Sequence, residues 1–578
     1  MILTALNDYY RRKMADPDPA RRLPAFGFED KEIPFVIELG SDGSLAAIKD
    51  TRSGDGKKKT AARFLVPKGV KKTSGIAANL LWDTAEYAVG VDTKDKPERV
   101  VQQHAAFRAR IDALPDAAQA DAGIVALRRF LDDQPQRALA ADPLWEEIRS
   151  ANPVVSFRLA EDSDLICQRP AIVESASQVT NQEADVTESM CLVTGSRHEA
   201  ERLHTAIKGV WGAQTSGANI VSFNLDAFNS YGKSQGANAP VGKHAAFAYT
   251  TALNHLLAKG SAQRIQVGDA STVFWAQQQD EVEDVFAQFF GETDDPDART
   301  VQVKALLEAV DTGKFDGGRG EKRFYVLGLA PNAARIAVRF WHAAPLRSIA
   351  SRVAAWFSDL EVGRGPNDPE YPSLFRLLTA ISVQGKADNI PPNLGGDVMR
   401  SILAGTPFPA MWLNAAVQRC RAEQRVTYLR AAAIKACLNR SIRRNDNEKE
   451  FAPMLDPSNT NTAYRLGRLF AALEKIQEEA SPGLNATIRD RYYGAASTTP
   501  VTVFTSLLRL KNAHLKKLNP GRTVWFEKLL AEVLGEVADF PAHLMLPDQG
   551  RFALGYYHQR QSFFTKHTDE HPNTSEGK

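Results

Sequence analysis

The sequence predicts an α+β protein in which a mixed N-terminal region with antiparallel hairpins precedes an all-α helical bundle. Residues 33–50 alternate apolar and polar side chains around a turn, and residues 323–342 contain two further strand-like runs. After about residue 348 nearly every apolar run has the period of a helix. We therefore predict an N-terminal domain over residues 1–348 and a C-terminal helical bundle over residues 349–578.

The N-terminal region begins with a predicted helix over residues 2–14, where Leu3, Leu6 and Tyr10 recur at helical spacing before the breaker Asp-Pro-Asp-Pro. A β-hairpin is expected next, because the alternating segment 33–50 turns at Ser-Asp-Gly. Polar residues 51–60 are expected to form a loop.

Further along the chain, residues 84–139 have the apolar period of helices. Residues 152–254 contain short apolar runs joined by Gly, Ser, Asn and Gln, and a second hairpin is expected over residues 323–342 around a Pro-Asn turn. The polar tail 565–578 has no apolar anchor and is expected to be disordered.

The composition is that of a soluble globular protein. The chain has 578 residues, of which 43% are hydrophobic and 24% charged, and its formal net charge is only +2. Any contact with a polyanion must therefore come from charge that is concentrated locally. No segment has the length of a membrane span or the pattern of a signal peptide, so a cytoplasmic protein is expected. Four widely spaced cysteines, expected to be reduced, suggest neither disulfides nor a zinc site: Cys167, Cys191, Cys420 and Cys437.

The most basic stretch is residues 49–72, which hold nine Lys or Arg against two acids. Phosphate backbones attract such clusters through counterion release, and small hydroxyl and amide side chains beside the charge can approach a nucleic-acid strand closely. A solvated loop is the alternative interpretation. The candidate DNA-binding residues here are Lys68, Lys71, Lys72, Thr73, Ser74 and Asn79.

A second stretch, residues 204–242, combines six glycines with many uncharged amides. Glycine lets backbone amides approach phosphate, and Asn and Gln can offer paired donors and acceptors to base edges. Trp211, Phe223, Phe228 and Tyr231 are aromatic residues able to stack on bases. A loop-rich structural segment is the alternative. The candidates are Lys208, Gln214, Ser216, Asn219, Asn224, Lys233, Gln235 and Asn238.

A third basic stretch covers the predicted helices at 412–444, where eight Lys or Arg face a single acid, Glu423. Arginines spaced by four residues share a helix face and could line a nucleic-acid channel. A solvent-facing basic helix is the alternative. The candidates for contact with phosphate are Arg419, Arg425, Arg430, Arg440 and Arg444.

Signatures of enzymes are missing from the sequence. It has no phosphate-binding GxxxxGK[ST], no HExxH and no His-Asp dipeptide. We therefore expect a protein that is not an enzyme and that needs no cofactor and no metal.

Several long segments carry a resemblance to a known family. MILTALNDYY, LVPKGVKKTSGIAANLLWD, IKGVWGAQTSGANIVSFNLDAFNSYGKSQGANAPV and GLAPNAARIAVRFW together resemble the large subunit of the type I-C CRISPR surveillance complex, Cascade. The resemblance implies a non-catalytic subunit in antiviral defence that recognises the protospacer-adjacent motif (PAM), promotes duplex opening and R-loop formation, holds the non-target strand and recruits a helicase-nuclease. The implied partners are guide RNA, target double-stranded DNA and its displaced strand, Cas5-type and Cas7-type subunits, a small subunit and the helicase-nuclease.

Residues 454–578 resemble the small subunit of the same complex. Systems of this type resemble one another in making that subunit from an internal start in the large-subunit gene, so translation from Met454 is expected to yield a separate helical protein. Two other functions stay open: a metal-independent RNA-processing nuclease that uses Lys, His and Tyr near residues 198–233, and a purely structural scaffold subunit.

Overall fold

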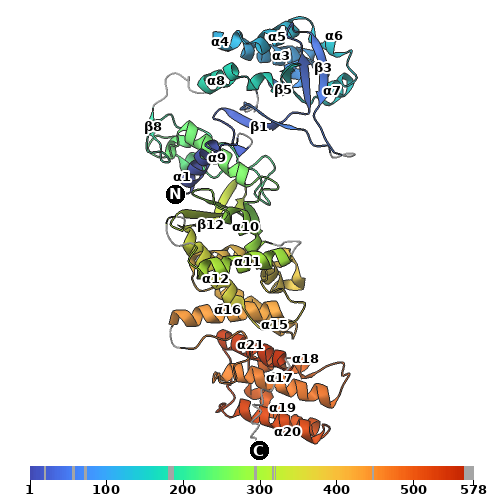
Figure 1. The fold of residues 1–578 in the computed structure, drawn as a ribbon, viewed down its shortest axis with the longest axis vertical. Helices are drawn as coiled ribbons and strands as arrows, with labels where there is room; N and C mark the ends of the chain where they lie inside the picture. Colours follow the sequence, from blue (N-terminus) through green and yellow to red (C-terminus); the bar gives the residue numbers. More distant parts are fainter. Residues whose placement is uncertain are drawn as a thin grey trace, which may run out of the picture. The chain divides into compact units, whose positions relative to one another are not determined.

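The computed structural model describes residues 1–18, 21–54, 59–70, 75–179, 188–291, 296–314, 318, 320–445 and 448–564. The tail 565–578, predicted to be disordered, lies outside these residues. Two compact units form the chain (Figure 1). The first unit contains Met1–Ala5, Thr205–Ser222 and Leu253–Lys578, and the second contains Leu6–His204 and Phe223–Ala252. The glycine- and amide-rich stretch 204–242 is therefore divided between the two units.

The second unit is built around a four-stranded sheet in the order β3-β2-β6-β5. The predicted hairpin is confirmed, because β2 (Phe35–Leu39) and β3 (Leu45–Asp50) pair antiparallel. The turn requires glycine at Gly43, whose φ is +91° and whose added Cβ would lie 2.6 Å from the Cβ of Arg129. The pairing of β2 with β6 (Val154–Leu159) is parallel, and β5 (Trp82–Thr84) joins β6 antiparallel.

Helices cover this sheet, as the period of residues 84–139 predicts. An aspartate begins α5, because the Asp121 side chain accepts a hydrogen bond from the Gly123 amide. The apolar stripe of α5 reaches the sheet, where Phe130 packs against Phe157 of β6 with ring centroids 6.4 Å apart. The helices of this part are α2 Ala85–Ala88, α3 Pro97–Asp112, α4 Asp116–Gln119, α5 Ala122–Asp132, α6 Pro135–Leu139 and α7 Trp145–Ala151.

The rest of the second unit consists of separate helices and short strand pairs. The predicted opening helix is α1, and most of its residues belong to this unit. Two short antiparallel pairs, β1 with β4 and β7 with β8, lie outside the main sheet. The remaining elements are α1 Ile2–Met14, β1 Phe28–Glu32, β4 Arg63–Pro67, α8 Pro170–Val179, β7 Ser189–Met190, β8 Arg197–His198 and α9 Lys243–Leu256, the last of which ends in the first unit.

The first unit contains a second four-stranded antiparallel sheet, in the order β12-β11-β10-β9. The predicted hairpin over 323–342 is confirmed as β11 (Arg323–Asn332) and β12 (Arg335–Pro345). The strands extend through the expected Pro-Asn turn, so the turn consists of residues 333 and 334, and Ala333 has a φ of +51°. The sequence analysis did not identify β9 (Arg264–Val267) or β10 (Ala270–Ala276).

The predicted α-helical C-terminal region is confirmed, and the chain is α+β. The change of class falls between β12 and α12, but one core continues across it, since Phe290 of α10 stacks on Trp356 of α12 with ring centroids 5.2 Å apart. The helices of the first unit are α10 Val282–Phe290, α11 Pro296–Asp311, α12 Leu346–Leu360, α13 Leu374–Ala380, α14 Leu394–Ala404, α15 Ala410–Ala422, α16 Tyr428–Asn445, α17 Thr462–Ala480, α18 Ile488–Ala496, α19 Val501–Leu515, α20 Pro520–Leu534 and α21 Leu546–Ser562.

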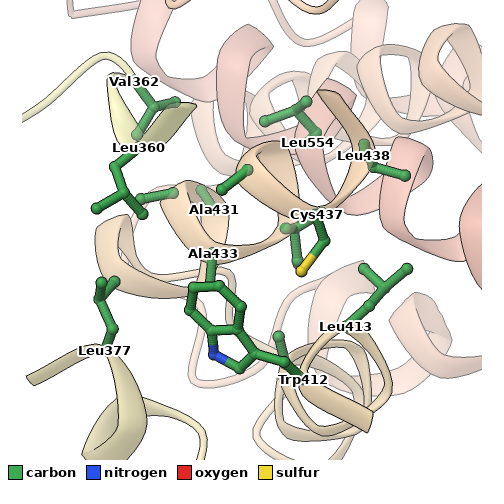
Figure 2. Close-up of a cluster of buried hydrophobic side chains, with 14 of the residues drawn as sticks. Leu360, Val362, Leu377, Trp412, Leu413, Ala431, Ala433, Cys437, Leu438 and Leu554 are labelled. Carbon is green, nitrogen blue, oxygen red and sulfur yellow. The ribbon is translucent and has the colours of Figure 1, made fainter. Parts of the chain in front are cut away.

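Two central helices organise this unit. Figure 2 shows α16 crossing the core, with Ala433 and Cys437 over Trp412 of α15 and with Leu554 of α21 on another side. Further along the chain α17 is buried along most of its length and contacts α18, α19, α20 and α21. Its closest approach is to α21, where the backbones meet at Gly467 and Gly555.

Candidate nucleic-acid interface

The first predicted patch is a loop whose two ends are tied together. Asn79 is buried, and its side-chain oxygen accepts a hydrogen bond from the Val70 amide at 2.9 Å. The Trp82 indole donates to the Pro67 carbonyl at 2.7 Å, closing the same loop from the other side. Asn79 therefore positions the loop, and we do not include it among the DNA contacts proposed below.

Several candidates for DNA contact lie inside this loop. Lys71, Lys72, Thr73 and Ser74 lie outside the described residues. Lys68, at the edge of the loop, is exposed, and its ammonium lies 5.7 Å from the centroid of the Phe247 ring.

Part of the basic charge upstream of this loop is neutralised by acids. Arg52 pairs with Asp50 at 2.7 Å and also with Glu147 of α7. The hydrogen bond from Arg52 lowers the pKa of Asp50 to about 2. Arg63 pairs with Asp30 of β1 at 2.8 Å. The free charge of the stretch 49–72 is thus smaller than its composition suggests.

In the first unit, the segment 205–222 has glycines at two positions where a side chain would clash with neighbouring backbone. Gly209 has a φ of +84°, and an added Cβ would lie 2.6 Å from the carbonyl oxygen of Leu257. Gly217 has a φ of +91°, and its added Cβ would lie 2.8 Å from the carbonyl oxygen of Ile207. Close packing therefore explains both glycines, in agreement with the alternative interpretation of this stretch as a loop-rich structural segment.

The polar side chains of this segment nevertheless face solvent. Lys208, Gln214 and Ser216 are exposed, while the Lys208 amide donates to the side chain of Asn254 at 2.7 Å. Asn219 is half-buried, and its carbonyl accepts a hydrogen bond from the Ile336 amide at 3.0 Å, which attaches the segment to the start of β12. A backbone braced by close glycine contacts and hydrogen bonds thus presents a cation, an amide and a hydroxyl.

In the second unit, the segment 223–242 uses several of its amides internally. The Asn238 side chain accepts from the Ser230 amide at 3.0 Å and donates to the Gln235 carbonyl at 3.0 Å. The Gln235 side chain accepts from Arg202 at 2.6 Å. Asn238 and Gln235 therefore shape the loop, whereas Asn224 and Lys233 are exposed.

In the third predicted patch, on α15 and α16, four of the eight basic residues pair with acids, two of them with an acid that lies far away in the sequence. Arg440 is buried and donates to Asp359 of α12 at 2.6 Å, and Arg443 donates to the same carboxylate at 2.9 Å. Lys435 is buried beside them, and burial lowers its pKa. Because the Arg440 side chain is buried and paired, it is not among the proposed DNA contacts.

Two more arginines of this patch share one acid. Arg430 is buried and pairs with Glu423, which also accepts from Arg419 at 3.3 Å. Arg430 further donates to the Ala380 carbonyl at 2.9 Å, so its guanidinium stabilises the fold. Arg425 and Arg444 are exposed, and among the described residues they have no ion-pair partner.

Arg425 lines a small polar cavity that the sequence analysis did not foresee. The cavity has a volume of about 360 Å³, and Arg489 of α18 and Arg560 of α21 also line it. Arg560 pairs with the fully buried Glu474 at 2.8 Å and with Glu478 at 3.2 Å, and Arg489 lies 3.5 Å from Asp490. Among the described residues, Arg425 is thus the guanidinium of the three without an ion pair. We call this the arginine pocket; its guanidinium groups are suited to phosphate oxygens.

The residues before and after Met454 form hydrogen bonds with different parts of the fold. Upstream, the Asn439 side chain of α16 holds Phe451 by accepting from its amide at 2.8 Å and donating to its carbonyl at 3.0 Å. The Pro453 carbonyl accepts from the Gly363 amide at 2.9 Å, just after α12.

Downstream of Met454 the partners belong to α17. The Tyr464 hydroxyl accepts from the Asp456 amide at 3.3 Å, and Arg465 donates to the Asn459 carbonyl at 2.7 Å. The last residues before Met454 are thus held by α16 and by the segment just after α12, and the first residues after Met454 are held by α17.

Other chemistry is sparse in the described part of the chain. Its residues include no cluster of three His, Cys, Asp or Glu side chains arranged to hold a metal ion. The four thiols are free and buried, and burial raises the pKa of Cys420 to about 12. Within the same residues, no helix is both long enough and apolar enough to span a bilayer.

The comparison with known families covers almost the entire fold. A family model described as CRISPR-associated protein (Cas_Csd1) matches residues 6–564. The chain belongs to the Csd1 family of CRISPR-associated proteins. No curated protein matches the sequence.

Proposed function

We propose that this chain is the non-catalytic large subunit of a type I-C CRISPR surveillance complex, Cascade. The observation that carries the proposal is the family match over residues 6–564, which includes both compact units. In this role the subunit recognises the PAM, promotes duplex opening and R-loop formation, holds the non-target strand and recruits the helicase-nuclease. Its partners are guide RNA, target DNA, Cas5-type and Cas7-type subunits and a small subunit, in the cytoplasm of a prokaryote.

Three groups of candidate residues have proposed contacts. Lys208, Gln214 and Ser216 are presented by a glycine-braced segment, which suits close contact with duplex phosphates and base edges next to the guide-paired sequence. Arg425, with the arginine pocket, and Arg444 suit the phosphates of a single strand, because guanidinium groups bind phosphate without regard to sequence. Lys68 and the residues 71–74 would add phosphate contacts at a third position.

We further propose that Met454 starts a separate small subunit. The change of hydrogen-bond partners at this residue, from α16 and the segment after α12 to α17, supports this proposal. A product that begins at Met454 keeps the hydrogen bonds that Tyr464 and Arg465 make with its first residues. The core around α17 also supports it: Arg468 is fully buried, and its guanidinium is held by Glu532 at 2.7 Å and by Gln559 at 3.0 Å, both within residues 454–578.

The experiment that tests the large-subunit role is DNA binding by the reconstituted guide-loaded complex, with and without this chain. Targets carry randomised bases beside the guide-matched sequence. We expect a short preferred motif only when the chain is present, and a change of preference at one position in Gln214→Ala. Equal affinity and equal selectivity without the chain would contradict the proposal and favour a scaffold.

A further inference from the structure

Tyr231 occupies an unusual position for an aromatic residue. It is 98% exposed and has a φ of +51°, and Gly232 follows it with a φ of +69°. The Lys233 amide donates to the Ser230 carbonyl at 2.9 Å, so residues 230–233 form a tight turn in which both central residues are left-handed.

The fold gains nothing that explains a tyrosine at this position. Asn and Asp, followed by Gly, are the residues that such turns prefer, whereas a bulky side chain in the left-handed region is strained. An aromatic ring that is 98% exposed makes almost no packing contact that could offset the strain. Strained residues that the surrounding structure nevertheless holds in place are concentrated at functional sites.

The turn is held rigidly by the loop behind it. Asn238 binds the Ser230 amide and the Gln235 carbonyl through its side chain. Gly236 is buried, and an added Cβ would lie 2.1 Å from the carbonyl oxygen of Glu201, so the backbone of this loop lies directly against a neighbouring segment. The ring of Tyr231 therefore projects from a fixed support into solvent.

We propose that Tyr231 stacks on an unpaired nucleobase. The inference rests on the proposed function, which brings the chain to nucleic acid. A stacking ring needs an open face and polar neighbours for the sugar and phosphate, and Tyr231 stands between exposed Asn229 and Ser230 on one side and Lys233 and Ser234 on the other. A protein partner would instead favour an aromatic anchor within apolar surroundings.

Two variants separate the ring from the backbone. Tyr231→Asn removes the ring and places a residue that the left-handed turn prefers, so it is expected to raise the melting temperature of the full chain. Tyr231→Phe keeps the ring. Leu225→Asn serves as a control, because Leu225 is another exposed apolar residue of the same unit, at 56% exposure.

The measurement uses the guide-loaded complex and 2-aminopurine, whose fluorescence is quenched by stacking. The base analogue is placed singly through the DNA next to and within the guide-matched sequence, and in a second series through the guide RNA. The proposal predicts one position at which wild type, Tyr231→Phe and Leu225→Asn alter the fluorescence and Tyr231→Asn does not. The series in which this position is found identifies the strand. We expect Tyr231→Asn to weaken target binding by roughly five- to 150-fold.

Three outcomes overturn the proposal. Tyr231→Asn could bind and quench like the wild type at all positions, Leu225→Asn could weaken binding equally, or Tyr231→Asn could fail to assemble with the other subunits, which would identify a protein contact. These results are distinct from a failure of the proposed function. If complexes with and without the wild-type chain bind DNA equally, the large-subunit role itself is refuted, whatever Tyr231 does.

Discussion

Replacing Gly467 by alanine is expected to destabilise the C-terminal bundle. A Cβ at this position would lie 2.0 Å from the carbonyl oxygen of Phe552 and 2.7 Å from the amide nitrogen of Tyr556 in α21. Both obstructing atoms are backbone, so no side chain can rotate away, and the two helices must separate by about 1 Å before a carbon can lie at an ordinary distance of roughly 3.3 Å.

The size of the effect follows from two opposing contributions. Overpacking a core costs about 1–3 kcal/mol, and a clash with rigid backbone falls at or above the upper end. Alanine regains up to about 1 kcal/mol of helix propensity over glycine. We therefore expect Gly467→Ala to lower the free energy of unfolding of the bundle by about 2–3 kcal/mol.

Hydrogen exchange of the purified full-length chain measures this directly. Amides of α17 and α21 should exchange roughly 30- to 150-fold faster in Gly467→Ala if they exchange through opening of the bundle. The matched control is Gly494→Ala in α18, where an added Cβ meets nothing within 4 Å. That variant should be neutral or up to about 1 kcal/mol more stable. Equal effects of the two substitutions would refute the reasoning.

Three further predictions concern pH, binding and translation. Burial lowers the pKa of His558 to about 3 from an ordinary 6.5, so the folded state binds this proton less readily than the unfolded state. The contribution of His558 to the free energy of unfolding is therefore complete above pH 6.5 and falls by about 1.4 kcal/mol per pH unit below it. His558→Gln should flatten that slope, measured by urea unfolding at pH 7.5 and pH 5. Lys208→Ala and Arg425→Ala should each reduce the salt dependence of DNA binding by about one unit, whereas Gln214→Ala should alter the preference for one base by about 1–3 kcal/mol with an unchanged salt slope. Met454→Leu should remove a product of residues 454–578 from the mass spectrum of the expressed complex without removing the full-length chain; persistence of that product would exclude Met454 as the start.

Elements with local determinants could be predicted from the sequence. The hairpin over 33–50 and the one over 323–342 each join residues that are close along the chain, and alternation and turn residues specify them. The parallel pairing of β2 with β6 joins Phe35 to Val155, and no local signal records such a contact. Likewise β10 is buried along its whole length, so it has no alternating pattern to reveal it.

The predicted interface rests on charge counted along the chain, and folding redistributes that charge in space. No acid lies within about one helical turn of Arg440 in the sequence, yet Asp359 lies 81 residues away and neutralises it. Conversely, Arg489 and Arg560 belong to separate helices, and only folding brings them to the pocket that Arg425 lines. Asn79 is predicted from the sequence to contact DNA, whereas in the structure its side-chain oxygen closes a loop by accepting from the amide of Val70, a contact that the sequence does not reveal.

The continuous core of the first unit determines how this protein can be divided for expression. Secondary structure suggests a cut between Pro345 and Leu346, where the last strand ends and a long helix begins. Such a cut would part Phe290 from Trp356, leaving large aromatic surfaces uncovered on both products, and each piece would be prone to aggregate. A gene fragment that ends or begins there is therefore a poor choice, although the change from strands to helices makes it the obvious one.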